Sequence, residues 1–190
     1  IYTNGDFSID FGFPWNGDFS RSLKVVYLIF SGSLGFYFSK LSAATATSTP
    51  QISNGVFDPV LEFGLGLSVG LEKEFNRGPL EAEFSLTVQG ILEGVISWFN
   101  PSAGGEKELF YRIQGSVSIV GRIYGKVDFL VIVVEVEVIA RATVRFAIEV
   151  YKPSHITLSA EVSVEASVSI LGIKTSFEFS LEVEESFTLG

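Results

Sequence analysis

The side chains able to perform catalysis are few and isolated in this sequence. The chain has one histidine, His155, in the segment YKPSH, and it has no cysteine. A catalytic triad needs a nucleophile, a histidine and a carboxylate that converge on one pocket, whereas a histidine beside a proline in a turn is usually solvated. One His and no Cys also exclude metal sites built from several of these ligands. We therefore predict no catalytic residue and no enzymatic activity.

Carboxylates are plentiful, but they have the spacing of a strand surface. Glycosidases need two carboxyl groups about 5–10 Å apart, and residues i and i+2 of any strand meet that distance. Glu135 and Glu137 follow the apolar run FLVIVV. Charges at such positions protect a strand against aggregation, which explains them without a catalytic role.

Two glycine-containing motifs also have structural explanations. The motif NGDFS occurs at residues 4–8 and 16–20, and Asn-Gly favours turns; its aspartates, with Asp10 between the copies, lack the acidic spacing of an EF-hand loop. In GLGLSVG (64–70) the glycines are two residues apart, as along a strand, and no evident helix follows. A dinucleotide-binding loop would lead from a strand into a helix. We predict no metal and no other cofactor, and we expect these glycines to permit curvature or close approach of another segment.

The composition excludes some partners and suggests others. The 190-residue chain has a net charge of −9, which argues against nucleic acid and anionic membrane surfaces. Hydrophobic residues make up 47% of the chain and charged residues 18%, so we expect apolar surface reserved for a partner or ligand. Apolar runs do not exceed six residues, against about 18–20 for a membrane-spanning helix. Because the chain begins at Ile1 and contains no Met, we expect a processed chain or a piece of a larger protein.

Apolar residues alternate with polar ones over most of the chain, which is the pattern of strands with one apolar face. Even positions are apolar from 130 to 150 and again from 156 to 170, while odd positions carry most of the charges. We predict a hairpin with a five-residue loop at 151–155, in which Val150 faces Ile156. That register places two ion pairs across the strands, Arg145 with Glu161 and Arg141 with Glu165.

Further strands follow from the same alternation. At Leu171-Gly172 the apolar residues change from even to odd positions. Either a two-residue turn pairs Ile170 with Ile173, or a bulge lies at Gly172. Other strands are predicted around 23–41 (one or two), 61–71, 82–98 and 109–123. A loop at 99–108 and an exit turn at 125–128 separate the later ones, and residues 42–55 form a polar linker.

These elements predict an all-β fold of eight or nine long, mostly antiparallel strands. A strand over 129–150 would span roughly 70 Å if straight, against a radius of gyration near 16 Å for a compact chain of this size. We expect a single domain over 1–190: N-terminal strands with the NGDFS repeat (1–41), the linker (42–55) and a long-stranded meander (56–190). The sheet or sheets would form a β-barrel or a two-layer sandwich with an apolar interior.

A structural role fits this architecture best. We expect an assembly module of an extracellular, surface or particle protein, which pairs with copies of itself or with other β-rich chains through sheet edges or exposed Phe. One alternative is a carrier or conduit for an apolar ligand such as lipid. Its candidate ligand or core face is formed by Val138, Ala140, Ala142, Val144, Ala160, Val162, Val164 and Ala166. Another is a membrane-inserting β-barrel pore, disfavoured because membrane strands need only about 9–11 residues and because the chain has two Trp and six Tyr without belt spacing.

Overall fold

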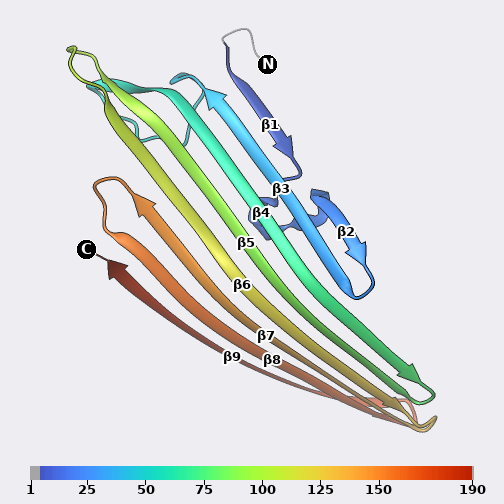
Figure 1. Cartoon of the computed structure of the whole chain (residues 1–190). Helices are drawn as coiled ribbons and strands as arrows, with labels where there is room; N and C mark the ends of the chain where they lie inside the picture. The colour runs from blue at the N-terminus through green and yellow to red at the C-terminus, as the bar shows by residue number, and fades with distance from the viewer. Residues whose placement is uncertain (1–4, 190) are drawn as a thin grey trace.

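The chain forms one open antiparallel sheet. The computed structural model describes residues 5–189, and its nine strands run mainly as a meander in which β3 to β9 pair in chain order. The strands are β1 (Phe7–Phe11), β2 (Leu23–Tyr27), β3 (Phe30–Leu41), β4 (Gly55–Arg77), β5 (Leu80–Pro101), β6 (Glu108–Asp128), β7 (Ile132–Glu149), β8 (Ser154–Ile170) and β9 (Ile173–Leu189) (Figure 1). The all-β, antiparallel prediction is confirmed, but the sheet does not close into a barrel.

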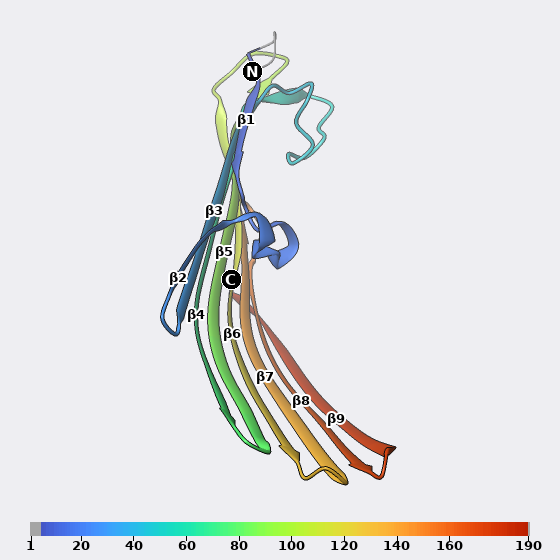
Figure 2. The same cartoon turned by 90° about the vertical axis from the view of Figure 1, so that its right-hand side faces the viewer.

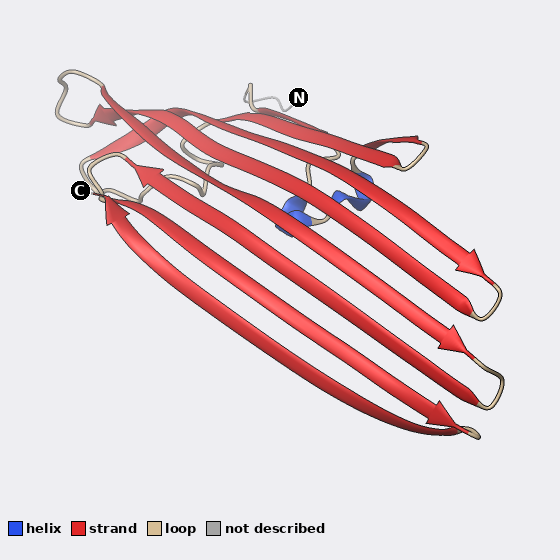
Figure 3. Ribbon diagram, turned by 60° about the horizontal axis from the view of Figure 1, so that its bottom comes forward, coloured by secondary structure: helices blue, strands red, loops and turns tan. Residues whose placement is uncertain are grey.

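The only helical elements in the described part of the chain are two short 3-10 turns, η1 (Trp15–Gly17) and η2 (Phe19–Arg21). They lie beside a single layer of strands (Figure 3). Within residues 5–189, no helix has the length and apolar character needed to cross a membrane.

The β8–β9 hairpin has the predicted two-residue turn. Ile170 pairs with Ile173, and Leu171 and Gly172 have φ angles of 51° and 84°. Positive φ at both central residues is the requirement of the hairpin turn whose twist matches the flanking strands. The apolar faces of the two strands therefore continue into each other without a bulge.

The β6–β7 turn lies later in the chain than the sequence pattern predicted. Residues 125–128, predicted as the exit turn, are the end of β6, and residues 129–131, predicted as strand, form the turn. The Asp128 carboxylate accepts a hydrogen bond from the Leu130 backbone N–H at 3.0 Å, and Leu130 has a φ of 66°. An aspartate side chain that bonds the backbone two residues on favours a turn, and here it outweighs the apolar character of FLV.

The β7–β8 pairing is shifted by four residues from the predicted register. Phe146, and not Val150, lies opposite Ile156. Val150 instead extends the pairing with β6, because its N–H donates to the Tyr111 carbonyl at 3.1 Å and its side chain packs against a buried cluster. A shift of four keeps the same residues on each face, so alternation alone could not detect it.

The segment 12–22 crosses one face of the sheet. β1 and β2 pair with two parts of the same edge of β3, and the chain between them passes over the glycines of β3 and β4. A Cβ at Gly35 would overlap the Gly12 carbonyl, and Cβ atoms at Gly64 and Gly66 would overlap Phe13 and Pro14 respectively. Two glycines of GLGLSVG, Gly64 and Gly66, thus permit close approach of another segment, which was one of the two roles predicted for the glycines of this motif.

The small buried core lies on this same face. Register shifts between Phe57 and Val60 of β4, so both side chains point to one side despite the odd spacing between them. They form a buried cluster with Val95, Phe110 and Ala46. Ala46 belongs to the 42–54 segment, which lies on the same side of the sheet as 12–22 (Figure 2).

Candidate functional site: the apolar face

The opposite face of the sheet is apolar across all nine strands. The register joins odd positions of β1, β2, β4, β6 and β9 with even positions of β3, β5, β7 and β8; for β4 this holds from residue 61 onward. We call this surface the apolar face and the other the polar face. One row of paired residues on it is Leu71, Leu86, Gly121, Ala140, Val162 and Leu181.

No described segment covers the apolar face, since 12–22 and 42–54 both lie over the polar face. Large apolar side chains are consequently exposed, both on β6 in the middle of the sheet, with Val117 and Ile119 at 48%, and on the outer strand β9, with Leu181 and Val183 at 55%. In most soluble proteins the apolar side of a sheet packs against another layer.

The eight residues predicted as an apolar ligand or core face lie together in the centre of β7 and β8 on this face. Ala142 pairs directly with Ala160, and Ala140 with Val162. Between larger neighbours, Ala142 and Ala160 line a shallow hollow of about 370 Å³ with Val117, Val144 and Leu158. They are surface residues of the single chain, with Val144 41% and Val162 38% exposed.

Charged residues on the apolar face are confined to a few positions in the strands. They are Lys40 of β3, Lys73 and Arg77 of β4, and Glu185 of β9. Their positions were not predicted, although each of the four residues interrupts the alternation of apolar residues in the sequence.

The polar face is held by side chains that bond across strands. The Arg122 Nη1 lies 2.5 Å from the Glu83 Oε1 on β5, and its Nε donates to Glu137 on β7. The hydrogen bond to Glu137, with the charges of both carboxylates, raises the pKa of Arg122. Ser118 and Thr143 share a hydrogen bond of 3.0 Å. These contacts fix the relative positions of β5, β6 and β7.

The two predicted ion pairs are not formed as predicted. Because of the four-residue shift, Arg141 lies opposite Glu161, with 3.7 Å between Nη1 and Oε2, and Glu165 lies opposite Glu137. Arg145 reaches Glu184 of β9 at 4.0 Å. Each pair is about half exposed, so its contribution to stability is small.

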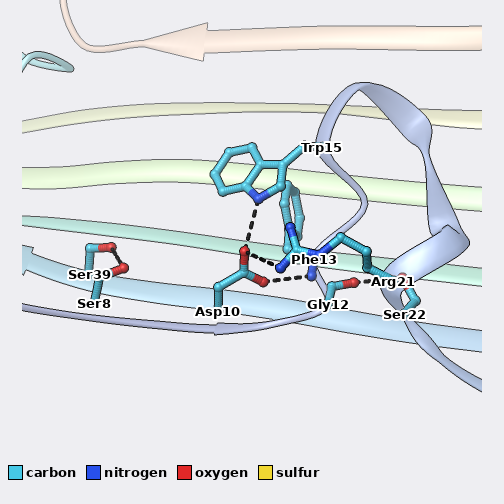
Figure 4. A network of polar contacts seen from close by, with 8 residues as sticks. All are labelled: Ser8, Asp10, Gly12, Phe13, Trp15, Arg21, Ser22 and Ser39. Atoms are coloured by element: carbon cyan, nitrogen blue, oxygen red, sulfur yellow. Dashed lines mark hydrogen bonds and ion pairs between the residues drawn. The ribbon is translucent and has the colours of Figure 1, made fainter.

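An aspartate that the sequence analysis considered only as a metal ligand instead organises the segment 12–22 (Figure 4). The Asp10 carboxylate accepts hydrogen bonds from the Phe13 N–H at 2.9 Å and the Trp15 Nε1 at 3.1 Å, and Arg21 lies 3.5 Å away. The hydrogen bond from the Phe13 N–H lowers the pKa of Asp10 most, and the hydrogen bond from the Trp15 Nε1 lowers it further. Nothing in the spacing of the sequence indicated this network.

The other aspartates of the repeat have separate roles. Asp6 accepts from Thr45, and Asp18 accepts from the Ser20 N–H at 2.8 Å. No group of three or more metal-binding side chains is found in residues 5–189, and Asn4 of the first NGDFS lies outside the described residues.

His155 lies inside β8 and not at the hairpin tip where it was predicted. It pairs with Ala147 of β7 and Thr188 of β9, and its Nδ1 is 3.4 Å from the Thr188 hydroxyl.

Comparison of the chain with protein-family models, curated proteins and solved structures found no match. Function must therefore be argued from the geometry of the two faces.

Proposed function

We propose that the chain is a non-enzymatic structural module that assembles with a second copy of itself, apolar face against apolar face, as a two-layer sandwich. The observation that carries this proposal is the uncovered apolar face of the sheet. Two sheets that pack in this way bury their apolar side chains in a core about 10 Å thick. The predicted apolar interior would then lie between two chains.

The exposed area supports an extensive interface. The chain has an accessible surface of 12651 Å², whereas a compact monomer of 20.7 kDa would have about 8,900 Å². The excess is about 3,700 Å² for each chain, so burial of about a third of it on both chains would give a total of about 2,500 Å², within the range of about 2,000–5,000 Å² that obligate dimers bury.

The edges of the sheet favour contact through the face. The outer strand β9 carries four carboxylates within eight residues: Glu178, Glu182, Glu184 and Glu185. The opposite edge consists of two five-residue strands, β1 and β2, on either side of the crossing segment. Charges and short strands are the means by which proteins protect sheet edges from addition of further strands.

The relief of the apolar face suits packing against an identical face. Small residues on β7 and β8 form the hollow around Ala142 and Ala160. Large aromatic residues lie toward the end of the sheet where the β4–β5 and β8–β9 turns are. They are Phe75 on β4, Phe84 on β5, and Phe177 and Phe179 on β9. Interdigitation of large and small side chains produces the close packing of protein interiors.

The open edges of the sheet and the Glu185 carboxylate argue against lipid as the material that covers the apolar face. An open sheet in a bilayer would leave backbone groups of its edge strands without partners, which costs several kcal/mol for each group. Glu185 would also lie in lipid on the apolar face. A protein surface does not place the first demand, because the edges of a sandwich remain in water.

The test is native mass spectrometry combined with sedimentation velocity on protein purified without detergent. We expect an even-numbered oligomer of the chain with no additional mass. A monomer over the whole accessible concentration range would overturn the proposal. Additional mass that disappears on organic extraction would also overturn it, in favour of the lipid carrier.

A further inference from the structure

The polar face contains a groove that neither the assembly nor the buried core uses. Two adjoining hollows of about 360 and 370 Å³ share Ile91, Glu93, Ser116 and Arg145 in their lining. The groove runs from the segment 12–22 across β5, β6 and β7 to β8. Each hollow alone has the size of a small-molecule site, about 300–1,000 Å³.

An exposed tryptophan forms one wall of this groove. The Trp15 side chain is 44% exposed although its surroundings hold it firmly. Its ring centroid is 4.6 Å from that of Tyr37, with 31° between the planes, and its Nε1 is bonded to Asp10. A rigid aromatic ring that remains open to solvent loses little entropy when a ligand stacks on it.

The carboxylate and the guanidinium of the groove, Glu93 and Arg145, have opposite charges, and each has a contact with another side chain. The Glu93 Oε2 accepts from the Gln114 Nε2 at 3.2 Å, and Arg145 is paired with Glu184. The remaining groups include the amide of Gln89 and the hydroxyl of Ser116. This set can both donate and accept hydrogen bonds without demanding a charged ligand.

From these features we propose that the groove binds a neutral oligosaccharide. A sugar ring has an apolar C–H face that stacks on an aromatic ring and hydroxyl groups that donate and accept hydrogen bonds. Trp15 supplies the platform, and Gln89, Glu93 and Gln114 supply the hydrogen bonds. In the proposed assembly the apolar faces are buried, so the groove of each copy stays accessible on the outer, polar face.

The experiment is isothermal titration calorimetry of the full chain with cellohexaose, maltohexaose and hexa-N-acetylchitohexaose, and with an oligogalacturonate as the anionic comparison. We expect saturable binding of at least one neutral hexasaccharide. Trp15→Ala should weaken this binding at least tenfold. Gln114→Ala should do the same, and because Gln114 lies on β6 it tests the groove without changing the segment 12–22. Ser163→Ala, on the polar face but outside the lining of the groove, should leave it unchanged.

Absence of saturable binding for all three neutral probes would overturn the inference, and so would binding of the oligogalacturonate alone. Affinity that is unchanged in both Trp15→Ala and Gln114→Ala would overturn it as well. The oligomeric state does not enter these measurements, so failure here leaves the proposed assembly standing, and the reverse holds too.

Discussion

A carboxylate at the centre of the apolar face should dissociate the assembly, while the same change one residue further should not. Ile119 lies on the apolar face between Val88 of β5 and Ala142 of β7. Val120 lies on the polar face between Thr87 and Arg141. Ile119→Glu and Val120→Glu are therefore a matched pair, with nearly the same chemical change on the same strand but on opposite faces.

The expected magnitude follows from the exposure of Ile119. Its side chain is 48% exposed in the single chain, so assembly would remove about half of it from water, worth about 1 kcal/mol. A partly hydrated carboxylate in an apolar interface costs at least about 1 kcal/mol more. A dimer contains the change twice, which makes the total at least about 4 kcal/mol and raises the Kd about a thousandfold.

Sedimentation velocity over a range of concentrations measures this difference, and circular dichroism checks that both variants retain the sheet. We expect Ile119→Glu to sediment as a monomer where the parent chain and Val120→Glu are oligomeric. Equal oligomerisation of the two variants, with the sheet intact in both, would show that the apolar face is not the interface.

Three further predictions concern residues that contact the segment 12–22. Gly35→Ala should lower the midpoint of denaturant unfolding by an amount equivalent to about 1–3 kcal/mol, because its Cβ has no space; Gly90→Ala, which meets no atom within 4 Å, is the control. Because the folded-state pKa of Asp10 is lowered, its stabilising effect is present above about pH 4 and is lost as the pH falls through that lowered value. In a Trp98→Phe background, which leaves Trp15 as the one tryptophan of the sequence, Asp10→Asn should therefore show a flatter loss of tryptophan fluorescence on acidification, and an unchanged acid profile would contradict the role of the carboxylate. Burial raises the pKa of Tyr37 to about 12. The contribution of the neutral Tyr37 hydroxyl to folding stability is therefore complete below about pH 10 and is lost as the pH rises from there to the folded-state pKa. Tyr37→Phe, which cannot ionise, should unfold at higher pH than the parent chain in an alkaline titration followed by circular dichroism.

The faces of the strands could be predicted from the sequence because alternation is a local property. Residues i and i+2 of a strand lie on the same side whatever the strand pairs with. The apolar set of β7 and β8 was therefore found at the correct positions, and the change of phase at Leu171-Gly172 predicted either a two-residue turn or a bulge, of which the turn is formed. The residues that take positive φ in that turn lie next to each other in the chain, so no distant contact was needed.

The register, the covering segments and the openness of the sheet were decided by the tertiary structure. The contacts of Val150 with β6 moved the β7–β8 pairing by four residues, a shift that leaves both faces unchanged and so has no local signature. Asp10 joins Phe13, Trp15 and Arg21 only because the chain crosses the glycines of β3 and β4. Alternation determines that one face is apolar. Whether another layer of the same chain covers that face depends on contacts between residues far apart in sequence, and here residues 5–189 leave it bare.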